Sequence, residues 1–502
     1  MNFYKKISDT CKRYPQKTAI LLGNKSSVTY AELDKLVARY SHALILSGVN
    51  VSDRVVSQAD KSIEALLLYL ACLRTGVIFV PLNTSYRDEE LQYFLEDARP
   101  KLFITSREPS GKIKSFCESI NIQAETLGAV EPSRFQSLVQ HASDESEIVA
   151  TNSSDTAVII YTSGTTGRSK GAMVTHENLI TNADALINLW RFSDADMLIH
   201  ALPIFHVHGL FVANHCALTS GATIIWHERF DLDQIMNALP TATVLMGVPT
   251  FYTRMLGDQR LMPELVTKMR LFISGSAPLL EETHTLFEAK TGHRILERYG
   301  MSEAGMITSN PYKGERKPGT VGCPLPGVKV RITDDDGNVT QDGSKGHVQI
   351  TGPNVFSGYW NNLEKTKEEF TADGWFKTGD IGEWDSDGYL SIVGRSKDLI
   401  ISGGFNVYPK EIELVIDAID GIKESAVIGV PHPDFGEAVT AAVILDSGSD
   451  LDVAQIMAKT QSQLAPYKVP KTIHFLDDLP RNAMGKVQKA ELRKMFSDDW
   501  VR

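Results

Sequence analysis

Residues 161–171 combine glycines, hydroxyl side chains and a lysine directly after an apolar run at 157–160. Glycines let a backbone turn tightly so that its N–H groups converge on an anion, while hydroxyls and an ammonium add further donors. The sequence therefore predicts a buried strand followed by a phosphate-binding loop. The residues expected to hold phosphates are Thr162, Ser163, Gly164, Thr165, Thr166, Gly167, Arg168, Ser169 and Lys170.

The spacing within this loop excludes one well-known kind of phosphate site. A Walker loop has Gly-Lys followed directly by Ser or Thr. Here Arg168 and Ser169 separate Gly167 from Lys170, and Gly171 follows the lysine. The loop is therefore not a kinase-type P-loop. Taken alone, its composition also fits a tight strand-to-helix turn that binds nothing.

The elements around the loop alternate between helix and strand patterns. Thr29-x-x-Glu32 is a capping box ahead of an amphipathic stretch, and 77–80 after Gly76 reads as a strand. The apolar run 65–73 predicts a buried helix that is too short to span a bilayer. Further strands are expected at 157–160, 223–226, 244–246 and 271–273. This alternation predicts α/β layers with ligands at the strand ends.

The pattern changes after about residue 317. Short alternating runs at 328–332 and 346–350, separated by Asp/Gly turns, predict antiparallel sheet and a small barrel. Past Arg395, a helix at 409–418 and strands at 425–430 and 441–444 predict a compact α+β tail. We expect an α/β protein with a large N-terminal domain, 1–396, and a smaller C-terminal domain, 397–502. The large domain would hold two α/β subdomains and the small antiparallel β-barrel.

Bulk properties exclude several classes of protein. The 502 residues exceed the size at which single cores stop growing, so at least two domains are expected. A formal net charge of −11 argues against a general nucleic-acid or anionic-membrane binder. Five cysteines without Cys-x-x-Cys spacing predict reduced thiols and no zinc site. The first ten residues lack a signal-peptide core, so a cytoplasmic location is expected.

Five more motifs follow in chain order. They are Arg298-Tyr-Gly-Met-Ser-Glu303, Gly374-Trp-Phe-Lys-Thr-Gly-Asp380, Gly394-Arg-Ser-Lys-Asp398, Gly403-Gly-Phe-Asn-Val-Tyr-Pro409 and Pro480-Arg-Asn-Ala-Met-Gly-Lys486. Together with the loop at 161–171 they resemble the adenylate-forming superfamily of acyl-CoA synthetases, firefly luciferase and peptide-synthetase adenylation domains. The resemblance covers essentially the whole chain, with the motifs in family order and spacing.

The resemblance implies a two-step reaction. A carboxylate attacks the α-phosphorus of ATP to give acyl-AMP and pyrophosphate, and a thiol then displaces AMP. In that scheme Glu303 would ligate Mg²⁺ with the Ser302 hydroxyl nearby, and Tyr299 would stack on adenine. Asp380 suits the ribose hydroxyls, and Arg395 offers donors to the ribose or phosphates. A capping Ser-Glu pair and a turn aspartate are the structural alternatives.

The C-terminal motifs imply a mobile domain. Lys486 would stabilise the charge that builds on the α-phosphate during adenylation. Lys397 occupies the family's hinge position, about which the small domain is thought to rotate between the two steps. Gly403 and Gly404 would then line a narrow channel for pantetheine, so coenzyme A is the expected acceptor thiol. A solvent-facing lysine and simple turn glycines are the alternatives.

Within the superfamily the chain looks like the malonyl-CoA synthetase branch. The segments that carry this resemblance are 201–209, 247–254, 271–278 and 296–300. Arg298 stands where many relatives have glycine, and a second carboxylate on the substrate would explain an arginine. The guanidinium of Arg254 or Arg298 would bind it bidentately, unless either one pairs with a buried acid. His206 is a further candidate for the acyl-site wall, and His208 a weaker one.

Several alternatives stay open. The enzyme could prefer methylmalonate or another short carboxylate, because one methyl alters selectivity by only about 1–3 kcal/mol. A non-catalytic nucleotide-binding paralogue is a different class, and a peptide-synthetase module is less favoured because no carrier domain follows Arg502. Arg168-Ser169 and Ser302 depart from the commonest family pattern, yet both retain the chemistry. Acylation of Lys486 by acyltransferases would remove its charge and switch off adenylation.

Overall fold

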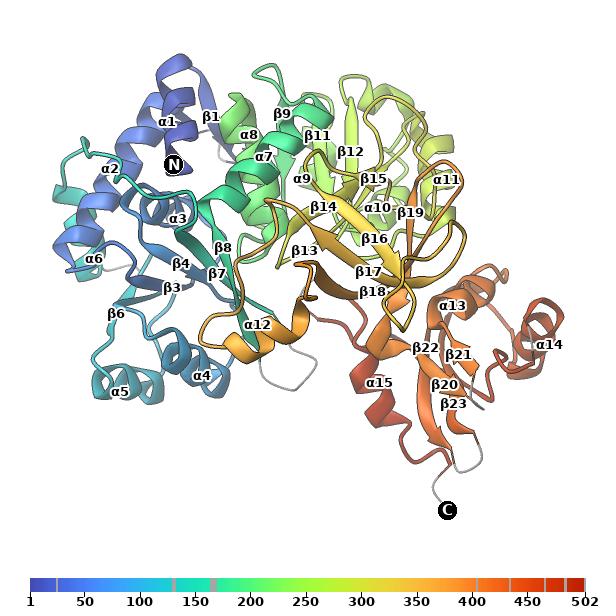
Figure 1. Cartoon of the computed structure of the whole chain (residues 1–502). Coiled ribbons are helices and arrows are strands. Elements are labelled where there is room, and N and C mark those ends of the chain that lie inside the picture. Colours follow the sequence, from blue (N-terminus) through green and yellow to red (C-terminus); the bar gives the residue numbers. More distant parts are fainter. Residues whose placement is uncertain are drawn as a thin grey trace. The chain divides into compact units, whose positions relative to one another are not determined.

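The computed structural model describes residues 1–23, 26–128, 132–162, 169–402, 405–432, 435–464, 466–482 and 485–500, without the side chains of 405 and 406. The chain folds into two compact units (Figure 1). The first comprises Met1–Lys329 with Ile350–Phe376, and the second comprises Val330–Gln349 with Lys377–Arg502. The short antiparallel runs that the sequence predicted after residue 317 are therefore shared between the units.

A six-stranded sheet forms one layer of the first unit, in the order β6-β5-β3-β4-β7-β8 among the described residues. It is parallel except for β8, which runs antiparallel to β7. Its strands are β3 (Arg54–Gln58), β4 (Ile78–Pro81), β5 (Leu102–Thr105), β6 (Gln123–Thr126), β7 (Thr156–Thr162) and β8 (Lys170–Thr175). The helices of this part are α2 (Tyr30–Leu46), α3 (Ile63–Thr75), α4 (Asp88–Ala98), α5 (Gly111–Ser119) and α6 (Arg134–His141).

A nine-stranded sheet forms the other layer of this unit, in the order β15-β14-β13-β12-β11-β9-β10-β1-β2 among the described residues. Its strands are β1 (Thr18–Leu22), β2 (Ser27–Thr29), β9 (Met197–His200), β10 (Thr223–Trp226), β11 (Val244–Gly247), β12 (Leu271–Ser274), β13 (Leu296–Met301), β14 (Gly305–Ser309) and β15 (Cys323–Pro324). The helices are α1 (Tyr4–Arg13), α7 (His176–Trp190), η1 (His208–Ala213), α8 (Asn214–Ser220), α9 (Leu232–Ala238), α10 (Pro249–Leu256), η2 (Pro263–Val266), α11 (Glu281–Thr291) and α12 (Leu363–Glu369).

The second unit contains two further sheets. One has the order β16-β17-β18-β19, and in the other β21, β20, β23 and β22 lie side by side with β24 parallel to β23. The strands are β16 (Lys329–Thr333), β17 (Gly346–Thr351), β18 (Phe376–Trp384), β19 (Leu390–Arg395), β20 (Ile400–Ser402), β21 (Phe405–Val407), β22 (Ile422–His432), β23 (Gly436–Leu445) and β24 (Thr472–Phe475). The helices are η3 (Ser396–Asp398), α13 (Pro409–Asp417), α14 (Val453–Gln463) and α15 (Lys489–Met495).

Local signals explain why several elements begin where they do. The Thr29 side chain accepts a hydrogen bond from the Glu32 N–H while the Glu32 carboxylate accepts one from the Thr29 N–H, so the predicted capping box starts α2. The predicted apolar helix is α3, which is buried from Ala65 to Thr75 and ends at Gly76 in a left-handed conformation. The strand expected at 223–226 is β10, with the same bounds.

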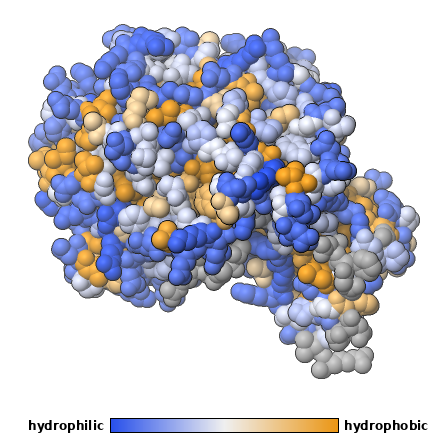
Figure 2. Space-filling model, in the orientation of Figure 1, coloured by the Kyte–Doolittle hydropathy of each residue, from blue (hydrophilic) through white to orange (hydrophobic). Residues whose placement is uncertain are grey.

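The surface mixes polar and apolar residues, and the cysteines form no disulfide bonds with one another. In the part of the chain that the structure describes, no helix is long and apolar enough to cross a membrane. Hydrophilic and hydrophobic residues are interspersed over the face drawn in Figure 2. All five cysteines are unbridged, and four of them are buried. Burial raises the pKa of Cys117 to about 11, which keeps this thiol protonated at neutral pH.

Candidate active site

The ends of β7 and β8 carry the first group of predicted residues. Thr162 and Lys170 face each other in the antiparallel register of these strands. The Thr162 hydroxyl donates to Glu303 Oε1 at 3.2 Å, and the Tyr359 hydroxyl donates to the same oxygen at 3.2 Å. The Lys170 Nζ lies 3.7 Å from Glu369 Oε1 and 5.1 Å from the centre of the Tyr359 ring. The structure thus brings Thr162, Lys170 and Glu303 together around Tyr359.

The loop at 161–171 leads into a strand and not into a helix. A strand-to-helix turn would be followed by a helix, but β8 follows and pairs with β7. The expectation of a strand-to-helix turn is therefore wrong, whereas phosphate binding by the loop stays a prediction. The predicted phosphate-binding residues Ser163, Gly164, Thr165, Thr166, Gly167 and Arg168 lie outside the described residues. Ser169 is described, and its carbonyl accepts a hydrogen bond from the Tyr93 hydroxyl at 2.7 Å.

Asparagines hold the turn that carries Ser302 and Glu303. Asn182 on α7 donates to the Met306 carbonyl at 2.8 Å and accepts from the Met306 N–H at 3.1 Å. Asn354 donates to the Ala304 carbonyl at 2.8 Å. Gly305 has φ +59°, and a Cβ there would lie 2.7 Å from the Asn182 side-chain oxygen, so the turn and α7 pack too closely for a larger residue.

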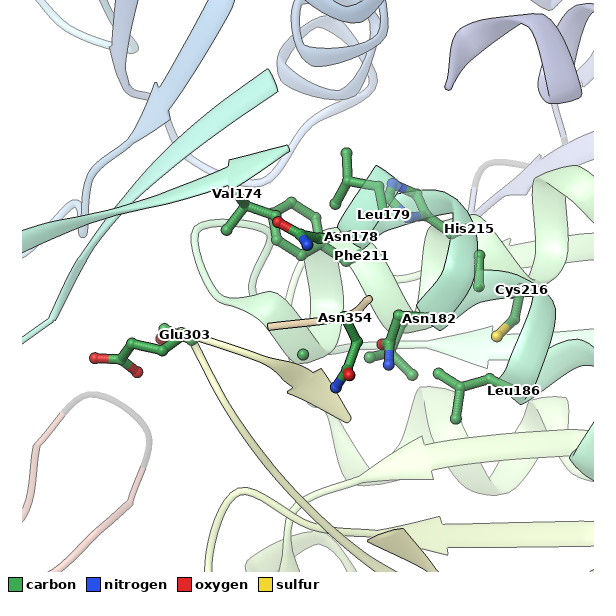
Figure 3. A pocket seen from close by; sticks show the side chains of 14 residues that line it. Val174, Asn178, Leu179, Asn182, Leu186, Phe211, His215, Cys216, Glu303 and Asn354 are labelled. Atoms are coloured by element: carbon green, nitrogen blue, oxygen red, sulfur yellow. The ribbon is translucent and has the colours of Figure 1, made fainter. Parts of the chain in front are cut away.

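A cavity lies behind this turn (Figure 3). Ser302, Glu303, Asn354 and side chains of α7, η1 and α8 line it. The Glu303 carboxylate points away from the labelled α7 and α8 side chains, whereas Asn182 and Leu186 point into the cavity (Figure 3). The candidate substrate residues His206, Arg254 and Arg298 are not among its lining residues. The carboxylate of Glu303 therefore lies on the side of the turn that faces Thr162 and not inside this cavity.

The oxygen atoms near Glu303 fit one magnesium ion. Among the described residues, no three His, Cys, Asp or Glu side chains form a group that could hold a metal. Mg²⁺ does not require such a cage, because it commonly takes one or two carboxylates and keeps waters and substrate phosphates as its other ligands. Glu303 supplies the carboxylate, and the Thr162 hydroxyl, which donates to Glu303 Oε1, is a further hard oxygen donor beside it.

Arg298 on β13 is a deeply buried cation of the first unit. Only 3% of its surface is exposed, and its Nε and Nη2 atoms have no hydrogen-bond partner among the described residues. Its guanidinium packs on the backbone of Gly275, where a Cβ would lie 2.4 Å from the Arg298 Cζ. Burial lowers the pKa of Arg298 to about 9, which leaves it protonated at neutral pH.

His208 lies beside this arginine. Its Nδ1 is 3.3 Å from the Ser276 hydroxyl, while its Nε2 is buried without a partner among the described residues. Burial lowers the pKa of His208 far below its ordinary value, and the Arg298 charge lowers it further, so the ring is neutral. Ser276 adopts φ +73°, an unusual conformation for a residue other than glycine. Polar atoms of Arg298 and His208 are thus buried together and unsatisfied.

The other two candidate substrate residues differ in exposure. Arg254 on α10 is exposed, and its guanidinium lies 5.7 Å from the centre of the Phe230 ring. His206 is partly buried beside Phe205, with ring centres 4.8 Å apart, and burial lowers its pKa to about 4. Among the described residues, neither Arg254 nor Arg298 forms an ion pair with a carboxylate. Tyr299 is half-buried on β13 opposite Thr308 of β14.

The second unit carries the remaining nucleotide candidates. Asp380 on β18 and Arg395 on β19 are partners in the antiparallel register, and Arg395 Nε lies 2.7 Å from Asp380 Oδ1. Asp380 is only 2% exposed, whereas a third of the Arg395 side chain is exposed. The Thr378 hydroxyl also accepts a hydrogen bond from the Asp380 N–H at 3.1 Å. The carboxylate is therefore held in one orientation beside a partly open guanidinium.

Lys486 lies near this pair within the same unit. Its side chain is exposed, yet surrounding protein atoms and the Arg395 charge lower its pKa, while Asp380 raises it. The lowered pKa makes the ammonium a better proton donor than that of a free lysine. Lys397 is exposed in η3, directly after β19. Gly403 and Gly404 lie outside the described residues.

Sequence reasoning missed Tyr359 and the asparagines. Tyr359 reaches Glu303 because residues 357–360 pair with β8: the Met173 N–H donates to the Gly358 carbonyl, and the Trp360 N–H donates to the Gly171 carbonyl. No spacing rule relates positions 56 residues apart, so only a family alignment of the Gly-Tyr-Trp segment would have indicated this role. Asn182 and Asn354 carry no sequence signal that distinguishes them from surface asparagines.

Two family models match the chain. Residues 7–360 match the model described as AMP-binding enzyme, and residues 411–486 match the AMP-binding enzyme C-terminal domain. The crystal structure of ATP-bound MatB from Rhodopseudomonas palustris superimposes with a TM-score of 0.97 and 49% identity, over 99% of each chain.

Curated relatives of similar identity differ in the acid that their names give. A malonate–CoA ligase from Arabidopsis thaliana is 35% identical over 491 residues, which cover 89% of this chain and 78% of that protein. A feruloyl-CoA synthase from Amycolatopsis is also 35% identical over 491 residues, which cover 96% of each chain. Overall identity therefore does not separate a small dicarboxylate from an aromatic acid, and the acyl site must be judged from its own residues.

Proposed function

The chain belongs to the AMP-binding enzyme family, and we propose that within this family it is an ATP-dependent malonate:CoA ligase. Its coarser activity is that of an AMP-forming acyl-CoA synthetase with ATP and CoA as co-substrates. The proposal goes further by naming malonate as the acid that is activated. The observation that carries it is the buried guanidinium of Arg298, which has two nitrogens without a partner among the described residues.

A dicarboxylate explains the state of Arg298 better than a neutral acyl chain does. An unpaired buried polar group costs about 1–3 kcal/mol, and a charged group costs more. A substrate carboxylate that reaches this site would satisfy Nε and Nη2 together, because a guanidinium binds a carboxylate in a bidentate manner. Malonate has one carboxylate for activation and a second that stays ionised. An aromatic or fatty acid would leave the guanidinium unpaired.

Adenylation requires stabilisation of charge on the phosphates. An oxygen of the activated carboxylate attacks the α-phosphorus, a new C(O)–O–P linkage forms, and the bond to pyrophosphate breaks. Lys170 and the Thr162 hydroxyl would bind the β- and γ-phosphates, and the Lys486 ammonium would stabilise the charge on the α-phosphate in the transition state. Mg²⁺ at Glu303 and Ser302 would neutralise phosphate charge.

Asp380, Arg395 and Tyr299 would orient the nucleotide. The Asp380 carboxylate accepts hydrogen bonds only, so it suits the two ribose hydroxyls, and the Arg395 pair fixes its direction. In the second step the CoA thiolate attacks the acyl carbon, a C–S bond forms, and the acyl C–O bond breaks so that AMP leaves with the bridging oxygen.

We retain 1–396 and 397–502 as the functional division, with Lys397 as the hinge. Lys397 is exposed in a single turn between β19 and β20, a position where a change in backbone torsion disturbs little packing. Rotation there would replace Lys486 at the reacting centre with the segment that contains Gly403 and Gly404, which would serve the pantetheine thiol of CoA.

Formation of AMP and acyl-CoA from a substrate series tests the proposal. The series comprises acetate, propionate, malonate, methylmalonate, succinate and octanoate, each with ATP, Mg²⁺ and CoA. A kcat/KM at least tenfold higher for malonate than for propionate is expected. A preference for a monocarboxylate would refute the malonate assignment while leaving the synthetase activity intact, and a preference for methylmalonate would identify the branched dicarboxylate as the substrate.

A further inference from the structure

Lys486 lies on a short hairpin in which the segments 480–482 and 485–488 pair with each other, and both segments are well anchored. The Gln488 N–H donates to the Pro480 carbonyl at 2.7 Å, and the Asn482 N–H donates to the Lys486 carbonyl at 2.9 Å. Leu479 before the hairpin and Leu492 after it are buried in one apolar cluster with Ala426, Ile428 and Phe496. The ends of the hairpin thus belong to the core between β22 and α15 (Figure 1).

The lysine itself receives little support from packing. Its side chain is exposed, and the Gly485 that precedes it adopts φ +73°, which gives the backbone there a conformation that most residues avoid. A lysine side chain is long and rotates about four bonds, so the place of its ammonium depends on the direction in which the backbone presents it. The Asn482 side-chain oxygen accepts a hydrogen bond from the Lys486 N–H at 3.0 Å, and a second side chain holds the peptide on the Gly485 side.

Arg481 fixes the peptide directly before the lysine. Its Nη1 donates to the Gly485 carbonyl at 2.9 Å, and its Nη2 forms an ion pair with Glu424 on β22. Asp478 is farther away, with its Oδ1 3.8 Å from Arg481 Nε, and it is largely exposed. One planar guanidinium therefore ties the Gly485–Lys486 peptide to a strand that pairs with β23 along ten residues.

We propose that Arg481, held by Glu424, is a positioning residue that aims Lys486 at the α-phosphate during adenylation. This inference rests on the proposed role of Lys486 and not on the identity of the acid. Arg481 touches neither substrate nor product in the proposal. It acts only through the Gly485 carbonyl, so its loss should slow the step that needs Lys486 and spare the step that does not.

Separate assays of the two half-reactions distinguish a positioning role of Arg481 from a merely structural one. Adenylation is measured as acid-dependent exchange of pyrophosphate into ATP, and thioester formation as acyl-CoA release from preformed acyl-AMP and CoA. Arg481→Ala should slow exchange about 10- to 100-fold, because a misplacement of about 1 Å costs up to that much. Thioester formation should stay within twofold. Arg481→Lys keeps the charge but lacks the planar guanidinium whose separate nitrogens reach Gly485 and Glu424 in a fixed geometry, so it should not restore exchange.

Lys489→Met is the matched control. Lys489 Nζ pairs with Glu413 Oε1 at 2.5 Å at the start of α15, so this variant removes another half-buried ion pair near the hairpin without touching Gly485. We expect a lower melting temperature and normal exchange. Equal losses in both half-reactions of Arg481→Ala, or a matching loss of exchange in Lys489→Met, would overturn the positioning role.

A double variant completes the test. In a Lys486→Ala background, Arg481→Ala should slow exchange no further, because the residue that it aims is gone. Independent, multiplicative losses would refute the inference, as would normal exchange in Lys486→Ala alone. If the wild type activates another acid of the substrate series instead of malonate, only the malonate proposal fails, and all variants are then assayed with that acid.

Discussion

Replacement of Arg298 by methionine should reduce the preference of the enzyme for malonate over propionate. Methionine has a similar length and flexibility but no charge, so the space beside Gly275 stays filled. A hydrogen bond to a charged group contributes about 1.5–3 kcal/mol, which corresponds to a loss of about 10- to 150-fold in kcat/KM for malonate. The malonate-to-propionate ratio should therefore fall by about one to two orders of magnitude.

The assay measures AMP and acyl-CoA with both acids in parallel, and the melting temperature of each variant. Arg298→Met should not lower the melting temperature, since the wild-type guanidinium has two nitrogens without a partner among the described residues. Arg316→Met is the control, because Arg316 donates to the carbonyls of Pro311, Tyr312 and Arg294 and should affect stability without changing the ratio. A ratio for Arg298→Met within threefold of the wild type would refute the reasoning. A larger change in Arg254→Met would transfer the role to the exposed arginine.

Four other predictions follow from the described contacts. Lys486→Gln, which removes the charge as acylation would, should leave only a small residual rate of acid-dependent pyrophosphate exchange but retain thioester formation from acyl-AMP; normal exchange would exclude both the catalytic role and the acylation switch. Glu303→Gln should raise the Mg²⁺ concentration for half-maximal activity at least tenfold, as a magnesium titration at fixed ATP will show. Asp380→Asn should raise the KM for ATP about tenfold or more through the lost charge of the Arg395 pair, with little change in the KM for CoA. Burial raises the pKa of Asp417 from 3.8 to about 7, so between these pH values the folded state keeps a proton that the unfolded state loses. The free energy of unfolding should therefore fall by up to about 1.4 kcal/mol per pH unit as pH rises through about 4 to 7. Asp417→Asn should flatten this decline in thermal unfolding experiments.

Local sequence patterns predicted the elements of this chain well. A capping box, a continuous apolar run and short β-branched runs depend on contacts between near neighbours, so α2, α3 and β10 lie where they were expected. The alternative of a helix directly after 161–171 is wrong, because β8 follows instead and pairs with β7. Glycine and hydroxyl content predicts a turn but not the element that follows it.

The site was predicted less completely, because its geometry depends on contacts between distant residues. The motif ending at Glu303 indicated a carboxylate, but its neighbour Tyr359 arrives through the pairing of 357–360 with β8. Arg298 was singled out from its place before a Tyr-Gly pair, whereas its burial on Gly275 and beside the neutral His208 required the fold. The roles of the loop residues 163–168 and of Gly403 and Gly404 stay predictions.

The pairing of residues 357–360 with β8 also has a consequence for synthesis. β8 is the last strand of its sheet in the described residues, and its outer hydrogen-bonding groups at Gly171 and Met173 are covered by a segment almost 200 residues downstream. At a translation rate of about 5–20 residues per second, this strand would wait about 10–40 s on the ribosome with an open edge. Open edges recruit other chains. A nascent chain of this protein should therefore be most prone to aggregation, and most dependent on chaperones, before residue 360 has emerged.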